Sequence, residues 1–131
     1  MAVIPDYEGY GVTSSDPHPY CSREITAKQM IDGAKAAVAW FEENVTKMPS
    51  GWKSVAVGYS QGGAVAASVL DNYHAHNQKG LDIIGAVCGD GPYDPLPTCQ
   101  RNRQPEVGPR RNKVITKKPA VLFAGFLLSI R

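Results

Sequence analysis

The chain has 131 residues, of which 43% are hydrophobic and 20% are charged, a composition typical of one globular domain with its own core. No apolar run reaches the roughly 20 residues that span a bilayer, and the N-terminus lacks the basic and apolar regions of a signal peptide. The net charge of +2 is uneven, because residues 1–95 carry −5 and residues 96–131 carry +7. We therefore divide the chain into a core, 1–95, and a basic, proline-rich tail, 96–131.

The first half of the core reads as a strand, a long loop and a helix. Residues 2–4 form a short apolar run that Pro5 ends, and residues 6–22 are rich in Gly, Pro, Ser and Asp, as loops are. Thr26 and Gln29 have the spacing of a capping box, and apolar residues then recur at helical spacing. We predict a helix over residues 25–45.

The second half of the core repeats this alternation. Residues 54–58 and 81–88 are predicted strands, with a helix over 61–76 between them. The order β-α-β-α-β favours a parallel sheet with helices packed on its faces. In the tail, only the apolar run 120–130 is long enough for another element, which we expect to be a helix.

The three cysteines do not have the spacing of a metal site, and no cofactor motif is present. Cys88 lies in a predicted strand and is expected to be a buried thiol. A disulfide that joins Cys99 to Cys88 or to Cys21 remains an open alternative. We predict neither a metal nor a cofactor.

The most informative motif is Gly58-Tyr59-Ser60-Gln61-Gly62, which matches G-x-S-x-G. It follows a predicted strand and opens a predicted helix, the context in which this motif forms a nucleophile elbow. We expect a sharp turn that exposes the Ser60 hydroxyl, with glycine at 58 and 62 because side chains there would collide with their neighbours. The helix N-terminus favours a developing negative charge, and the Gln61 N–H is the expected oxyanion-hole donor.

The glycine-rich turn around Ser60 has two other interpretations besides a nucleophile elbow. One is a glycine-rich turn that happens to contain serine. The other is a phosphate-binding turn, which would need G-x-G-x-x-G or G-x-x-x-x-G-K-[ST], and neither pattern is present.

The flanking motifs resemble a known group of proteins. The elbow GYSQGG, the upstream PDYEGYG (5–11) and HPY (18–20), and the downstream GDGPYDP (89–95) together look like α/β-hydrolases of the secreted lipase/esterase type, which include prolyl-oligopeptidase-like hydrolases. The resemblance covers residues 2–95. It implies the central part of that fold, with a three-stranded parallel sheet core, flanking helices and the tail in the position of a lid or cap.

A serine hydrolase also needs a histidine base and a carboxylate that orients it. The resemblance places both after the serine, yet only His74 and His76 follow Ser60, near the far end of its predicted helix and about 20 Å away at the helical rise per residue. His18 is the remaining candidate base, although the resemblance gives it a structural role. Asp90 follows a predicted strand at the same sheet edge and is the fallback acid.

We expect a serine hydrolase of the lipase/carboxylesterase type that acts on an ester or lipid substrate, as the central piece of a larger enzyme. A prolyl-oligopeptidase-type peptidase and a non-catalytic interaction module with the same fold are the alternatives. A weaker one is nucleic-acid binding by the basic tail. The unpaired edges of a small parallel sheet favour self-association. The group it resembles is often secreted, and the sequence predicts no location.

Overall fold

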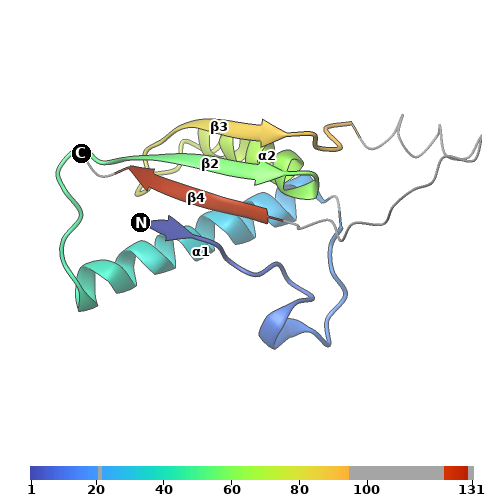
Figure 1. The fold of residues 1–131 in the computed structure, drawn as a ribbon, viewed down its shortest axis with the longest axis horizontal. Helices are drawn as coiled ribbons and strands as arrows, with labels where there is room; N and C mark the ends of the chain where they lie inside the picture. The colour runs from blue at the N-terminus through green and yellow to red at the C-terminus, as the bar shows by residue number, and fades with distance from the viewer. Residues whose placement is uncertain (21, 95–122, 130–131) are drawn as a thin grey trace, which may run out of the picture.

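The computed structural model of the chain describes residues 1–20, 22–94 and 123–129 (Figure 1). The elements in chain order are β1 (Ala2–Val3), η1 (Gly11–Thr13), α1 (Arg23–Asn44), β2 (Lys53–Tyr59), α2 (Gln61–Ala75), β3 (Ile83–Gly89) and β4 (Phe123–Ser129). Each strand and α-helix before residue 90 has its bounds within two residues of the prediction. The fold is therefore broadly α/β, as expected.

The sheet differs from the prediction in one strand. Its order is β1-β4-β2-β3, with β2 and β3 parallel and β4 antiparallel to both β1 and β2. The structure does not show the predicted three-stranded parallel core, because β4 lies between β1 and β2. The predicted helix over 120–130 is wrong where the structure describes it, since 123–129 form a strand. An apolar strand in this place satisfies the backbone groups of two neighbours that would otherwise be open edges.

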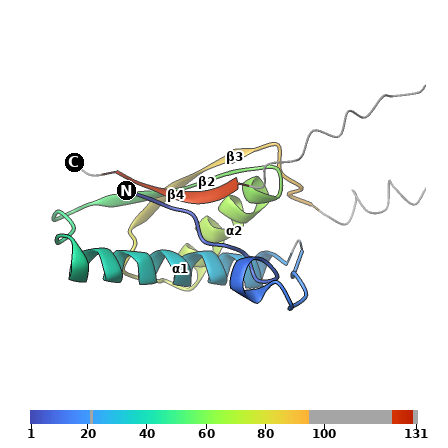
Figure 2. The ribbon, with the colours of Figure 1, turned by 60° about the horizontal axis from the view of Figure 1, so that its bottom comes forward.

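Both helices cover the same face of the sheet (Figure 2). Alternate residues of β2 are buried, and α1 and α2 each present a row of buried residues to this face. Thr26 lies inside α1 instead of capping it, because the helix begins at Arg23; its hydroxyl donates to the Ser22 carbonyl oxygen at 2.5 Å. The largest fully buried apolar side chains lie between the layers: Met30, Ile31, Val69, Leu81 and Ile83.

The opposite face of the sheet has no helix over it in the part of the chain that the structure describes (Figure 2). Val57 of β2 pairs with Val87 of the edge strand β3, and Val87 is 59% exposed. Tyr59 of β2 is also exposed. This face, together with the outer edge of β3, which pairs with no other strand among the described residues, is called the open sheet face.

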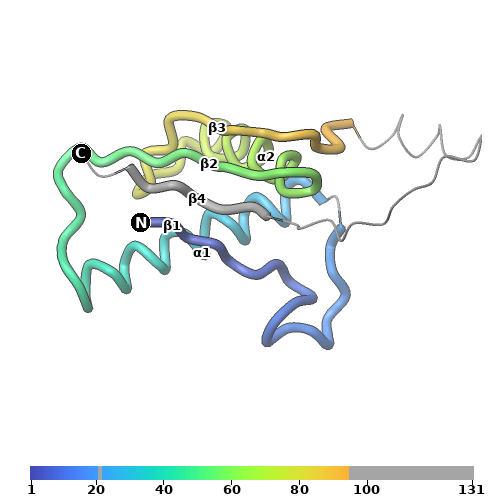
Figure 3. The backbone as a smooth tube through the Cα atoms, viewed as in Figure 1, coloured from blue at the N-terminus to red at the C-terminus, as the bar shows by residue number. Residues whose placement is uncertain are grey.

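The loop between β1 and α1 runs to the end of the sheet where β2 leads into α2 (Figure 3). Local hydrogen bonds give it shape: the Gly9 N–H donates to Thr13 Oγ1 at 3.0 Å, and the Tyr10 N–H donates to the Tyr7 carbonyl at 3.0 Å. This loop brings His18 beside the start of α2. No helix in the described residues is long and apolar enough to cross a membrane.

Candidate active site

Ser60 alone forms the turn between β2 and α2. Its backbone has φ +56° and ψ −123°, a conformation that non-glycine residues rarely adopt and that costs on the order of 1–3 kcal/mol. Strain of this kind persists only where the surrounding structure imposes it. Here it reverses the chain within one residue, as the sequence analysis predicts for a nucleophile elbow.

Close backbone packing explains why the turn is rich in glycine. A Cβ added to Gly58 would lie 2.0 Å from the carbonyl oxygen of Gly62, which supports the expected need for glycine at position 58. Two further glycines, which no sequence motif predicted, also lack room for a side chain. A Cβ on Gly63 would lie 2.6 Å from the Gly89 carbonyl oxygen, and one on Gly91 would lie 2.6 Å from the Ala64 nitrogen. The end of β3 is therefore packed directly against the first turn of α2.

The elbow leaves its polar groups available for a ligand. The Ser60 N–H donates to the Gly89 carbonyl at 2.8 Å, but the Ser60 hydroxyl does not cap α2 and has no hydrogen-bond partner within the described residues. The first two N–H groups of α2, those of Gln61 and Gly62, likewise have no acceptor there. A hydroxyl beside free N–H groups at a helix N-terminus suits attack on a carbonyl carbon and stabilisation of the resulting oxyanion.

His18 lies beside this turn, with both ring nitrogens occupied. Its Nδ1 is 2.8 Å from the Glu8 carbonyl oxygen, and its Nε2 is 2.8 Å from Nε2 of Gln61. Tyrosine rings surround the imidazole, with centroid separations of 5.0–6.0 Å: Tyr7, Tyr10 and Tyr20. The described residues include no hydrogen bond between His18 and Ser60.

Asp90 reaches the sheet edge at which the sequence analysis places it. Tyr59 and Gly89 are paired at the ends of two parallel strands, so Asp90 follows β3 where Ser60 follows β2. Its backbone is also strained, with φ +43°, and its carboxylate forms no hydrogen bond or ion pair with another described residue. Asp90 is near the elbow in the topology but is not connected to His18.

His74 and His76 lie at the opposite end of α2, as predicted. The ring of His76 forms a 3.0 Å contact from Nδ1 to the Asn72 carbonyl oxygen, and both histidines are exposed. The chain has three histidines in all, so His18 is the sole histidine at the elbow.

Buried polar atoms without partners gather around the His18 loop. Tyr7 Oη, Gln29 Oε1 and Gln61 Oε1 are buried and have no hydrogen-bond partner among the described residues. Burial raises the pKa of Tyr7 to about 12. Gln61 is only 3% exposed, and His18 is the one described hydrogen-bond partner of its side-chain amide. No sequence pattern predicts this contact, because 43 residues separate its partners.

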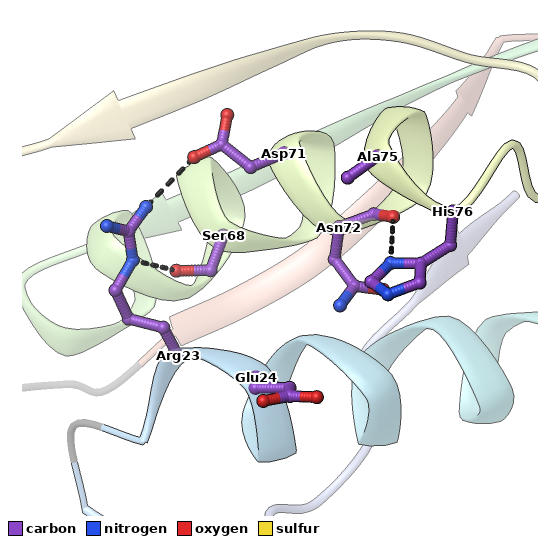
Figure 4. Close-up of a pocket in the computed structure, with 7 residues that line it drawn as sticks. All are labelled: Arg23, Glu24, Ser68, Asp71, Asn72, Ala75 and His76. Atoms are coloured by element: carbon purple, nitrogen blue, oxygen red, sulfur yellow. Dashed lines mark hydrogen bonds and ion pairs between the residues drawn. The ribbon is translucent and has the colours of Figure 1, made fainter.

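A groove of about 240 Å³ lies between α1 and α2, away from the elbow (Figure 4). Arg23 crosses one end of it, donating from Nε to Ser68 Oγ at 3.1 Å and pairing with Asp71 at 2.9 Å. This ion pair is exposed, so it contributes little to stability. Ser60 does not line the groove.

The prediction of a buried Cys88 is wrong: this free thiol is exposed, because β3 is an edge strand. Desolvation and the nearby Asp71 raise its pKa. Cys21, Cys99 and the basic segment 96–122 lie outside the described residues, as do the disulfide and nucleic-acid alternatives that depend on them. Within the described part, no group of three metal-ligating side chains occurs.

No protein-family model, curated protein or solved structure matches this chain. A functional assignment therefore depends on the geometry of the elbow and on the motifs around it.

Proposed function

We propose that Ser60 is the nucleophile of a serine ester hydrolase of the lipase/carboxylesterase type. The observation that carries this proposal is the backbone of Ser60, which is strained at φ +56°. Among the described residues, its hydroxyl has no hydrogen-bond partner and lies beside N–H groups of α2 that have no acceptor. A serine whose only role was to cap the N-terminus of a helix would be expected to accept a hydrogen bond from a backbone N–H of the first turn with its side-chain oxygen. The motif resemblance over residues 2–95 supports the same class.

The chemistry follows from these groups. Ser60 Oγ would attack the ester carbonyl carbon, and the carbonyl π electrons would move to the oxygen, which the Gln61 N–H stabilises as an oxyanion. Collapse of this intermediate would break the ester C–O bond, and the alkoxide would leave as the alcohol by taking up the proton that Ser60 lost. Water would then hydrolyse the acyl-serine to the free acid and restore the serine. An N–H at this position typically contributes a factor of about 10²–10³ to the rate in comparable sites.

The proton of Ser60 needs an acceptor. His18 is the histidine nearest in the fold, but the contact between its Nε2 and Gln61 must break before it can reach Ser60. Asp90 has no described link to His18 that would orient it. The site thus has a candidate nucleophile and an oxyanion donor, but no hydrogen bonds among the described residues link Ser60, His18 and Asp90 into a catalytic triad. We propose ester hydrolysis at Ser60 and assign no residue as its base.

Competition between a fluorophosphonate, which labels activated serines, and candidate substrates tests the substrate class. The candidates are short-chain acyl esters, long-chain acyl esters and prolyl peptides, and the measurement is how far each protects Ser60 against labelling. We expect protection by esters and none by peptides. Protection by prolyl peptides alone would contradict the esterase proposal and favour the peptidase alternative.

A non-catalytic interaction module is the second candidate, and the open sheet face favours it. This face exposes Val87 and Tyr59, and the outer edge of β3 pairs with no other strand among the described residues. An unpaired strand edge can pair with another chain. Self-association through this edge is the form of interaction that we propose. It is compatible with the ester hydrolase, because the open sheet face does not include Ser60.

A further inference from the structure

We propose that His18 is a positioning residue that holds Gln61, and through it the oxyanion N–H, rather than the base that activates Ser60. This inference rests on the proposed function and assigns His18 a role in the same site. It follows from the contacts of the two side chains and from their burial.

The Gln61 side chain has one hydrogen-bond partner among the described residues, and it is His18. The two Nε2 atoms lie 2.8 Å apart, the Gln61 side chain is 3% exposed, and its Oε1 has no described partner. A buried amide with a single partner depends on that partner, because the loss of the bond leaves a second polar atom unsatisfied.

The surroundings of His18 determine how it bonds. The Glu8 backbone carbonyl is only an acceptor, so Nδ1 of His18 must carry a proton and donate it. In the neutral ring Nε2 is then an acceptor, which matches the NH₂ group that Gln61 directs toward it. The rings of Tyr7, Tyr10 and Tyr20 pack around the imidazole at centroid separations of 5.0–6.0 Å.

Holding Gln61 matters because its side chain and its oxyanion N–H belong to the same residue. The Gln61 N–H belongs to the Ser60–Gln61 peptide group, whose carbonyl oxygen accepts from the Gly63 N–H at 3.0 Å and from the Ala64 N–H at 3.3 Å. The contact of the Gln61 side chain with His18 holds the same residue from a second side. Small displacements of an oxyanion donor strongly reduce the stabilisation of the transition state, because that stabilisation depends on an N–H group that already points at the oxyanion.

The test compares variants of both residues by the rate of fluorophosphonate labelling. In this reaction the Ser60 Oγ–P bond forms, the P–F bond breaks, and fluoride and a proton leave. We expect His18→Ala and Gln61→Ala each to slow labelling about tenfold, and the double variant to be no slower than either. His18→Gln, whose side-chain oxygen can accept from Gln61 but cannot act as a base, should restore most of the rate. His74→Ala, at the far end of α2, is the matched control and should not change it.

The results separate this proposal from the base role. If His18 were the base, His18→Gln would be as slow as His18→Ala, and Gln61→Ala would release the imidazole and speed labelling; either result would overturn the proposal. If the wild type is not labelled, the proposed function fails, and labelling rates can no longer test the positioning role of His18. That role is then tested by NMR of the backbone amide of Gln61. The Gln61 backbone amide signal should then shift in His18→Ala and return in His18→Gln. An unchanged signal in His18→Ala would refute the inference.

Discussion

Substituting Gly58 by alanine tests whether the elbow is packed as described. The added Cβ would lie 2.0 Å from the Gly62 carbonyl oxygen and 2.2 Å from its carbonyl carbon, whereas ordinary contacts begin at 3.4 Å. The first turn of α2 must therefore retreat by about 1.4 Å, the difference between 3.4 and 2.0 Å. Because the opposing atoms are backbone, no change of rotamer relieves the clash. We expect a loss of about 3 kcal/mol in the free energy of unfolding, at the upper end for overpacking.

Gly85→Ala is the matched control, because an added Cβ there meets nothing within 4 Å. It should be neutral or stabilise the chain by up to about 1 kcal/mol, since alanine loses less backbone entropy on folding. Urea unfolding followed by circular dichroism measures both. With a slope of about 2 kcal/mol/M, Gly58→Ala should lower the midpoint by roughly 1.5 M. Equal midpoints for the two variants would refute the close approach of β2 and α2.

Three further predictions concern other parts of the chain. Tyr7→Phe should stabilise the fold by about 1 kcal/mol by removing a buried hydroxyl that has no hydrogen-bond partner among the described residues. Burial raises the Tyr7 pKa from 10.0 to about 12, so the contribution of the neutral phenol to stability is present below pH 10 and is lost as pH rises through 12. The difference between wild type and variant in thermal melts should therefore change over that window. A melt difference independent of pH would contradict this burial. In a background with Cys21→Ser and Cys99→Ser, the exposed Cys88 thiol should react with a thiol reagent. Because the Cys88 pKa is raised, the reaction should be slower at neutral pH than that of the free amino acid cysteine. An equal rate for the two thiols would contradict the raised pKa. Val87→Lys should reduce self-association in sedimentation velocity, whereas substitution of the fully exposed Val12 in η1 by lysine should not. Equal effects of the two variants would exclude the open sheet face as the interface.

The elements around the elbow could be predicted because their signals are local. The apolar run before Gly58, the single serine between glycines and the helical spacing after Gln61 occupy adjacent positions, so the strand, the turn and the helix follow from neighbouring residues. The sheet edge shared by Ser60 and Asp90 follows from the parallel pairing of β2 and β3.

Features that depend on distant contacts could not be predicted. An apolar run such as 120–130 fits a helix or a buried strand equally well, and only its pairing with β1 and β2 decides between them. The apolar strand around Cys88 predicts a buried thiol, but Cys88 is exposed because β3 lies at the edge of the sheet. The contact between His18 and Gln61 joins a loop to a helix and has no periodic signal in the sequence.

Mass spectrometry of the intact chain after fluorophosphonate treatment measures whether Ser60 is an activated nucleophile, as we propose. We expect one adduct that maps to Ser60 and is absent in Ser60→Ala, with the circular dichroism spectrum of that variant unchanged. A folded wild type without an adduct, or with adducts shared equally among exposed serines such as Ser50, would contradict the claim.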